Sequence, residues 1–267
     1  MSSVIHPSRR RERLLALLQQ RDFYTVAELK KLTGSPHATL HRDLTALAGE
    51  GILRKSRGGV ELLVSSGVVR EYDRRVRLHV AQKQAIARSA LERIHAGDHV
   101  FLDASSTCYY LGKILLAKNP AGVTIVTNSL HLLEEYRKSD SGIMAVSTGG
   151  TLDRELGAFL GTFTEGFLAQ VRVARVFVSA AGWSADAGTT TTSDLILGTS
   201  KAALAMASEC YCLADSSKYG RDHVFSIAPL AGFSAIITDS GLDLSVIRQL
   251  RRSRIPLIIG RGGEHDA

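Results

Sequence analysis

The sequence predicts an α/β protein in which an N-terminal winged helix-turn-helix precedes a Rossmann-like, mostly parallel α/β domain. Three observations predict it: capped helices and a glycine-rich hairpin at the start, alternating apolar strands and helices afterwards, and positive charge confined to the start. The chain has 267 residues, 45% of them hydrophobic, which is enough for two folded domains. We place the winged helix-turn-helix at residues 1–63, a polar, arginine-rich linker at 64–80 and the α/β domain at 81–267.

The first two helices follow from leucine spacing and from capping residues. Residues 9–20 place four leucines on one face, the pattern of an amphipathic helix. Thr25 and Glu28 form a capping box, in which the two side chains satisfy free backbone amides at a helix start. We expect this second helix to end at Gly34, because glycine readily adopts the positive φ that terminates helices.

A third helix and a hairpin complete the first domain. Ser35 and Pro36 supply an N-cap and a proline at the first helical position. The leucines that follow recur at intervals of four and three residues, so this helix buries one stripe. Residues 52–55 and 60–63 are typical of two short strands, and the residues between them form a basic, glycine-rich turn.

Apolar strands alternate with helices beyond residue 81. The candidate strands lie at residues 99–103, 123–127, 143–147, 173–179, 210–214, 235–238 and 256–259. The candidate helices lie at residues 81–94, 108–117, 130–139, 193–208 and 244–252. Continuous apolar strands that alternate with helices predict a mostly parallel sheet covered on both faces.

Positive charge is concentrated near the N-terminus. Residues 1–60 contain eleven Lys or Arg and five Asp or Glu, whereas residues 81–267 contain eighteen of each kind. A basic domain joined to a neutral one is typical of nucleic-acid-binding proteins. We therefore expect the first domain to bind double-stranded operator DNA, with the third helix in the major groove and the hairpin as a wing.

The predicted DNA-binding residues are polar or basic side chains of the third helix, its N-cap and the wing. Such side chains donate to base edges or to phosphates. The alternative is an ordinary solvated face on a winged helix that contacts protein, but helix order, caps and charge together favour DNA. The residues are Ser35, His37, Thr39, His41, Arg42, Thr45, Arg54, Lys55 and Arg57.

Polar segments follow five of the candidate strands and predict a ligand cleft. They lie at residues 103–107, 127–129, 147–150, 179–182 and 215–218. In open α/β sheets ligands bind at the carboxyl ends of the strands. Hydroxyls and free amides at a helix start attract anions, and Lys218 offers a counter-charge. Any one of these loops is as well explained by helix capping, but five that converge favour a cleft.

The N-terminal motifs resemble a known family of regulators. Ser-Pro-His-Ala-Thr-Leu-His-Arg-Asp-Leu at 35–44, then Gly-Ile-Leu-Arg at 51–54 and Arg-Gly-Gly at 57–59, is similar to the signature of the DeoR family of bacterial sugar-metabolism regulators. The usual family pattern is T-I-R-R-D-L, followed by G-x-L-x-R-x-x-G-G-A. His41 stands where arginine is usual, and Arg57 stands where histidine is common. The resemblance implies the docking mode but no particular operator sequence.

The resemblance continues through the second domain and covers the chain from about residue 9 to residue 259. The DeoR sensor is related in fold to ribose-5-phosphate isomerase and glucosamine-6-phosphate deaminase, and it recognises a phosphorylated sugar or a related intermediate. Carried over to this sequence, the resemblance implies two sets of effector-binding residues. Asp103, Ser105, Ser106 and Thr107 would form the phosphate loop, and Asn128, Gly149, Gly150 and Lys218 would line the same cleft.

Three departures from the family pattern fall at the implied effector site. Ser105 replaces the usual glycine of D-x-G-T-T, which narrows the backbone approach to a phosphate. Ala181 replaces an aspartate of the family's G-A-D-G-like turn, and residues 194–198 lack the acidic pair common before Lys201. The resemblance therefore implies the class of effector without naming a compound.

Two other functions are possible for a chain of this pattern, an enzyme and a metal or redox sensor. A sugar-phosphate isomerase or deaminase needs a general acid and base around its substrate, but Ala180, Ala181 and Gly182 stand where those enzymes carry a carboxylate. A metal or redox sensor would use Cys210 and Cys212, but C-x-C on an apolar strand lacks zinc-site spacing and fits a core. We therefore expect no catalysis, no metal and no cofactor.

Composition sets the remaining expectations. Residues 1–20 lack the apolar segment of a signal peptide, the longest apolar runs are shorter than a membrane span, and three cysteines make no disulfide framework. We expect a cytoplasmic homodimer or homotetramer without membrane contact. It would act as a repressor of carbohydrate-metabolism genes, with operator DNA and a phosphorylated, sugar-type effector as its partners.

Overall fold

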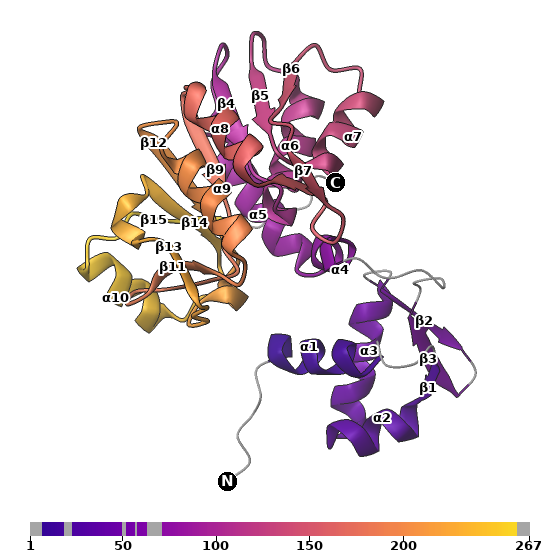
Figure 1. The fold of residues 1–267 in the computed structure, drawn as a ribbon. Coiled ribbons are helices and arrows are strands. Elements are labelled where there is room, and N and C mark those ends of the chain that lie inside the picture. Colours follow the sequence, from indigo (N-terminus) through magenta and orange to yellow (C-terminus); the bar gives the residue numbers. More distant parts are fainter. Residues whose placement is uncertain (1–6, 19–22, 50–51, 57, 63–70, 261–267) are drawn as a thin grey trace. The chain divides into compact units, whose positions relative to one another are not determined.

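The computed structural model describes residues 7–18, 23–49, 52–56, 58–62 and 71–260. The chain forms two compact units, Met1–Val69 and Arg70–Ala267 (Figure 1). Each unit has its own buried core. The predicted fold class is confirmed: a helix-turn-helix unit comes first, and a mostly parallel sheet with helices follows.

The first unit contains three helices and a three-stranded antiparallel sheet. The helices are α1 (Pro7–Leu18), α2 (Val26–Thr33) and α3 (His37–Gly49). The strands are β1 (Phe23–Thr25), β2 (Leu53–Ser56) and β3 (Gly59–Leu62), in the order β1-β3-β2. The predicted hairpin is present, with its strands shifted by about one residue. The sequence did not predict β1, because three residues carry no periodicity.

The caps of α2 are those that the sequence predicts. Thr25 Oγ1 accepts from the Glu28 amide at 3.2 Å, and Glu28 Oε2 accepts from the Thr25 amide at 2.8 Å. Gly34 has a φ of 64° and donates to the Lys30 carbonyl at 3.0 Å. On α3, the leucine stripe Leu40, Leu44 and Leu47 is buried, which leaves the opposite face of the helix exposed.

Two adjacent glycines shape the turn of the wing. Gly58 has a φ of +83°, which L-residues rarely adopt. Gly59 lies so close to β1 that a Cβ atom would be 2.3 Å from the Tyr24 carbonyl oxygen. The Gly-Gly pair predicted as a turn therefore also allows β1 to pack against the β2–β3 hairpin.

The second unit is built on a seven-stranded sheet in which each strand pairs in parallel with its neighbours. All seven candidate strands from the sequence are in it. They are β4 (His99–Leu102), β5 (Thr124–Thr127), β6 (Met144–Ser147), β9 (Arg175–Val178), β12 (Glu209–Leu213), β14 (Ala235–Asp239) and β15 (Leu257–Gly260). Their order is β15-β14-β12-β9-β4-β5-β6 (Figure 1).

This strand order contains a topological switch point between β4 and β9. The chain starts at β4, adds β5 and β6 on one side, and then returns to place β9 on the other side of β4. In open α/β sheets, ligands bind in the crevice outside the carboxyl ends of the strands at such a switch point. Asp103 and Ser179 lie directly after these strands.

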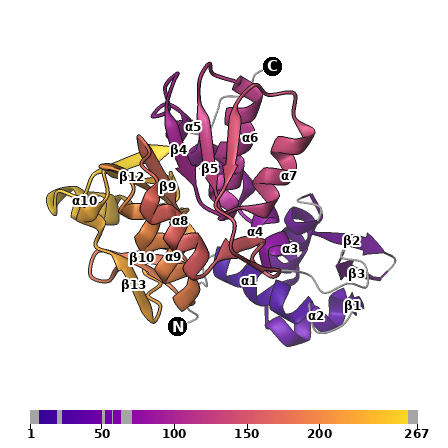
Figure 2. The ribbon, with the colours of Figure 1, turned by 45° about the horizontal axis from the view of Figure 1, so that its top comes forward.

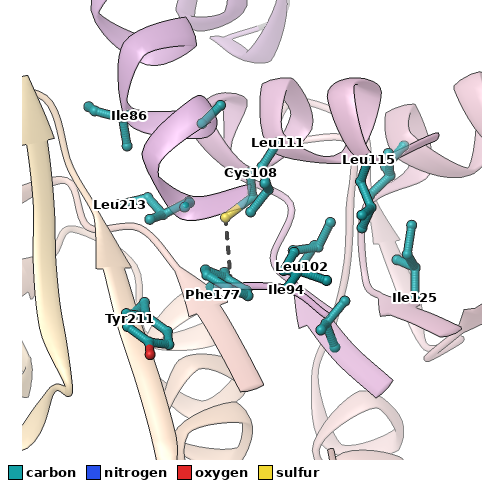
Figure 3. Close-up of a cluster of buried hydrophobic side chains, with 14 of the residues drawn as sticks. Ile86, Ile94, Leu102, Cys108, Leu111, Leu115, Ile125, Phe177, Tyr211 and Leu213 are labelled. Carbon is teal, nitrogen blue, oxygen red and sulfur yellow. Dashed lines mark hydrogen bonds between the residues drawn. The ribbon is translucent and has the colours of Figure 1, made fainter. Parts of the chain in front are cut away.

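Helices cover both faces of the sheet (Figure 2). On one face, α5 (Val80–Leu91), α6 (Ser106–Lys118) and α7 (Leu130–Lys138) contribute to a core with one set of strand residues. Figure 3 shows part of this core, where the Cys108 thiol donates to the Phe177 carbonyl at 3.4 Å. On the other face, α8 (Thr162–Gln170), α9 (Asp194–Leu204) and α10 (Leu244–Arg252) pack on the alternate residues.

Several short elements were not predicted from the sequence. A β-hairpin, β7 (Thr151–Asp153) with β8 (Ala158–Leu160), follows β6. A separate antiparallel sheet joins β10 (Gly182–Ser184), β11 (Gly188–Thr191) and β13 (Phe225–Ala228). Two 3₁₀ turns, η1 (Ser216–Lys218) and η2 (Leu230–Gly232), follow β12 and β13.

The segment predicted as a linker contains a helix. Residues 64–80 include α4 (Glu71–Arg77), which belongs to the second unit, while residues 63–70 lie outside the described residues. The sequence of α4 is polar and arginine-rich, but its Tyr72 side chain is buried, with only 2% of its surface exposed. Among the helices that the structure describes, none has the length and apolar character needed to cross a bilayer.

Candidate functional site

The candidate DNA-binding surface is the outer face of α3. His37, His41, Arg42 and Thr45 are exposed there, opposite the buried leucines. Thr39 and the preceding Ser35 are half-buried at its margin. The rings of His37 and His41 stack with their centroids 6.1 Å apart. The helix therefore presents exposed hydrogen-bonding side chains, with the two histidines one turn apart, on the face that a recognition helix turns to the major groove.

The wing is tied to this helix by a hydrogen-bond chain. Lys55 Nζ donates to Thr45 Oγ1 at 2.6 Å, and the Thr45 hydroxyl donates to the His41 carbonyl at 2.7 Å. Arg54 is exposed on the same strand, β2, whereas the predicted wing residue Arg57 lies outside the described residues. The contact joins two of the predicted DNA-binding elements into one surface.

Asp43 is a structural residue of this unit that the sequence reasoning did not single out. Its side chain is only 3% exposed and accepts from Arg10 Nη2 at 3.0 Å and from Arg11 Nε at 3.4 Å. The hydrogen bond with Asp43 raises the pKa of Arg10. Asp43 thus links α3 to α1. This link fixes α3 on the side opposite its exposed face.

Asp103 organises the second candidate site at the switch point. One carboxylate oxygen accepts from the Ser105 amide at 2.9 Å, and the other accepts from the Ser179 amide at 2.7 Å. The loops after β4 and β9 are therefore joined by one side chain. Ser179 was not among the predicted site residues. Its position directly after a buried strand is the sequence feature that could have identified it as a site residue.

The loop after β4 leads into α6 as predicted. Ser105 is its N-cap, and Ser105 Oγ accepts from the Cys108 amide at 3.2 Å. Ser106 and Thr107 are buried in the first turn, and the Thr107 hydroxyl has no hydrogen-bond partner among the described residues. A buried hydroxyl without a partner is costly unless a ligand or a water satisfies it.

Lys218 contacts the loop that follows β9. Its ammonium group donates to the Ala180 carbonyl at 2.8 Å and to Ser179 Oγ at 3.2 Å. Asp215 is buried beside it. Burial opposes ionisation of Asp215, but the charge of Lys218, followed by that of His79, outweighs it and lowers the pKa below the ordinary 3.8. Asp103, Ser105 and Lys218 therefore belong to one network through Ser179.

The glycine loop after β6 and Asn128 form a second group. Asn128 Nδ2 donates to the Phe159 carbonyl at 3.1 Å, whereas Asn128 Oδ1 is buried without a partner among the described residues. Gly149 and Gly150 both have positive φ, and a Cβ on Gly150 would be 2.1 Å from Thr164 Oγ1. The strand order places both groups at the carboxyl edge of the sheet. Binding of an effector by either group stays a prediction.

The three cysteines and one surface hollow are not part of the predicted effector site. Cys108, Cys210 and Cys212 are free and buried, and burial raises the pKa of Cys212 to about 12, so its thiol is unreactive. The described residues contain no cluster of three His, Cys, Asp or Glu that would hold a metal. A surface hollow of about 340 Å³ near Lys113 and Glu135 includes none of the predicted effector residues.

Fold and surfaces together define a class: a transcriptional regulator that carries a helix-turn-helix and an α/β sensor on one chain. Two family models match it, the DeoR-like helix-turn-helix domain at residues 10–66 and the DeoR C-terminal sensor domain at residues 78–240. The chain belongs to the DeoR family. It is a DNA-binding transcriptional regulator rather than an enzyme.

Several bacterial and archaeal transcriptional regulators are similar to this chain over most of its length. The regulator YgbI of Escherichia coli, named as uncharacterised, is 30% identical over 96% of this chain and 98% of its own. GlpR of Haloferax volcanii is 28% identical over 95% and 98%, and the L-fucose operon activator of Haemophilus influenzae is 26% identical over 87% and 92%. Among solved structures, a ribose-5-phosphate isomerase in complex with phospho-erythronic acid covers 51% of this chain and 52% of its own, with a TM-score of 0.38 and 19% identity.

Proposed function

We propose that the protein binds operator DNA through α3 and the wing, and that a phosphorylated sugar or a related metabolite at the switch-point crevice controls this binding. The observation that carries the proposal is the pairing of the α6 N-terminus with Lys218 through Asp103 and Ser179. We propose that the protein represses genes of carbohydrate metabolism.

A phosphate fits the crevice for three physical reasons. The start of α6 offers backbone amides and the positive end of a helix dipole. The Thr107 hydroxyl is buried there without a partner among the described residues. Among the described residues, the Lys218 ammonium group donates to Ser179 Oγ and to the Ala180 carbonyl, so its third hydrogen can make a charge-assisted bond to an anion. The name of one relative, the L-fucose operon activator, supports a sugar-type effector.

The DNA-binding half of the proposal follows the usual geometry of such units. Two copies related by symmetry would place their α3 helices in successive major grooves, about one helical turn or a multiple of it apart. We propose a homodimer or homotetramer for this reason. An effector changes DNA affinity only if it binds one arrangement of the paired units more tightly than the other.

Substitution of Arg42 tests the DNA-binding surface. We expect Arg42→Ala to weaken operator binding by about 10- to 100-fold, because a base or phosphate contact from an exposed guanidinium is lost. Binding is measured by fluorescence anisotropy on a duplex selected from a random pool by the wild-type protein, at fixed ionic strength. Arg137→Ala, which removes an exposed arginine from α7, is the matched control. Wild-type affinity in Arg42→Ala would exclude this face of α3.

The effector class is tested with the wild-type protein and its single tryptophan. Trp183 is fully buried, and its indole N–H donates to the Asp215 carbonyl at 3.4 Å, next to Lys218. We expect one phosphorylated sugar or polyol from a panel to shift Trp183 emission. At about 100 times its Kd, it should stabilise the protein by about 2.7 kcal/mol. Inorganic phosphate and the unphosphorylated parents are the controls. A response to a free sugar alone would contradict the phosphate assignment and leave the DNA-binding assignment intact.

A further inference from the structure

Helix α4 is the first helix of the second unit, and it is fastened to both groups of the candidate effector site. It begins at Glu71, one residue after the unit begins at Arg70. Any signal that leaves the second unit along the chain toward the first must pass through it. Its contacts therefore show which part of the effector site it can respond to.

The start of α4 is fastened by Tyr72. The Tyr72 amide donates to the Glu155 carbonyl at 3.0 Å, in the turn of the β7–β8 hairpin. The Tyr72 ring stacks on His131 with centroids 3.8 Å apart and planes 13° apart. Gly157 makes room for this stack, because a Cβ there would be 2.2 Å from His131 Nε2.

The surface under Tyr72 is continuous with the Asn128 group. Residues 128–131 and 155–159 run side by side. The Phe159 amide donates to the Asn128 carbonyl at 2.8 Å, and the Leu130 amide donates to the Gly157 carbonyl at 2.9 Å. Ser129 and Ala158 form an isolated β-bridge between these two bonds. The backbone around Asn128 is thus hydrogen-bonded to the same hairpin that holds Tyr72.

The carboxyl-terminal end of α4 is held by a lysine of α5. The buried Lys83 of α5 donates its ammonium hydrogens to the carbonyls of Arg75 and Leu78. Lys83 also contributes, with His79, to the positive field on Asp215. The last turn of α4 also accepts a bond from α6, whose Tyr110 hydroxyl donates to the Val76 carbonyl at 3.0 Å.

The Tyr72 contact is well packed, but its hydrogen bonding is incomplete. The Tyr72 hydroxyl and His131 Nε2 are both buried, and neither has a hydrogen-bond partner among the described residues. Burial of an unsatisfied polar atom costs free energy, so the docked position of Tyr72 is less stable than a fully satisfied contact of the same area. Local openings of such a segment occur at low free-energy cost.

We propose that α4 is a latch: Tyr72 docked on His131 and Glu155 couples occupancy of the effector site to the DNA-binding unit. The inference rests on the proposed function for its consequence, but the coupling between Tyr72 and Asn128 is a property of the second unit alone. The latch is a route by which effector contacts reach the connection to the first unit.

Two substitutions at Tyr72 should act in opposite directions. Tyr72→Ala removes the ring and loosens the docked state. Tyr72→Phe keeps the ring and removes the unsatisfied hydroxyl, which tightens the docked state. The matched control is Tyr211→Phe, which removes a hydroxyl bonded to Glu209 at the amino-terminal end of the sheet.

Hydrogen exchange of the full chain tests the latch without effector or DNA. We expect the Phe159 and Leu130 amides to exchange about tenfold faster in Tyr72→Ala and about fivefold slower in Tyr72→Phe. The Ser234 amide, which donates to the Cys210 carbonyl on β12, is the reference, and its exchange rate should not change. Unchanged exchange at Phe159 in Tyr72→Ala, or equal or faster exchange in Tyr72→Phe, would overturn the proposal.

A second measurement tests the consequence of the latch. The Kd for the selected duplex is measured with and without the panel compound that shifts Trp183 emission, in wild type and in Tyr72→Ala. We expect the ratio of the two constants to fall toward one in Tyr72→Ala while the Trp183 response is retained. A wild-type ratio would overturn the latch. A panel without any hit would contradict the proposed effector class, and the exchange experiment would still decide the latch.

Discussion

Asp43→Ala is expected to unfold the DNA-binding unit selectively. Asp43 is a carboxylate on α3 that is almost fully buried, and two arginines of α1 donate to it. Its removal leaves the partly buried Arg10 without this counter-charge, and breaking such a pair costs about 3 kcal/mol. A unit of this size has only a few kcal/mol of stability, so operator binding should be lost along with the fold.

The two units can be followed separately in this experiment. Trp183 lies in the second unit, so its emission reports on that unit alone, whereas far-ultraviolet circular dichroism reports on both. We expect the transition of the first unit to fall by about 10–20 °C. Asp43→Asn should lose less, and Arg42→Ala should lose DNA affinity without a change in stability. If Asp43→Ala left the first transition in place, the ion pair would have no structural role.

Lys218→Gln is expected to weaken the binding of phosphorylated compounds. Glutamine can still donate to the Ala180 carbonyl, but it removes the positive charge next to Asp215 and the donor that we assign to the phosphate. Loss of a charge-assisted bond in a crevice should weaken binding by about 10- to 100-fold. Operator affinity should be retained, because Lys218 lies in the second unit.

The same variant should show a defined pH dependence of stability. The pKa of Asp215 is lowered in the folded protein, so its ionised form stabilises the fold above the ordinary value of 3.8. That contribution is lost as the pH falls through the lowered pKa. The stability difference between wild type and Lys218→Gln should therefore be largest near neutral pH and shrink below about pH 4. Lys201→Gln, an exposed lysine on α9, is the control. A wild-type Kd in Lys218→Gln, measured by titration of the Trp183 emission, would remove Lys218 from the effector site.

The parts of the fold that the sequence predicted are those with a strong local signal. The seven parallel strands are continuous apolar runs, and the capping box of Thr25 and Glu28 is a short motif with one reading. Asp103 and Lys218 were predicted because they follow buried strands. The network between them was not, because it passes through Ser179, which is 76 residues from Asp103 and 39 from Lys218.

The parts that the sequence did not predict depend on contacts between distant residues. Asp43 looks like any polar residue on a helix until Arg10 is placed beside it. Tyr72 lies in a charged stretch that is typical of a linker, and only His131 and the Gly157 turn explain why its ring is buried. Strands of three residues, such as β1 and β8, carry too little periodicity to be recognised.

Release of DNA by a phosphorylated compound is the most direct test of the account. The wild-type protein is bound to the selected duplex at fixed ionic strength, and the panel compound that shifts Trp183 emission is added to saturation while anisotropy is recorded. We predict that DNA affinity falls by at least about fivefold, with no change for the unphosphorylated parent. An unchanged affinity at saturation would show that the site and the DNA-binding surface are not coupled, and would contradict the proposed function.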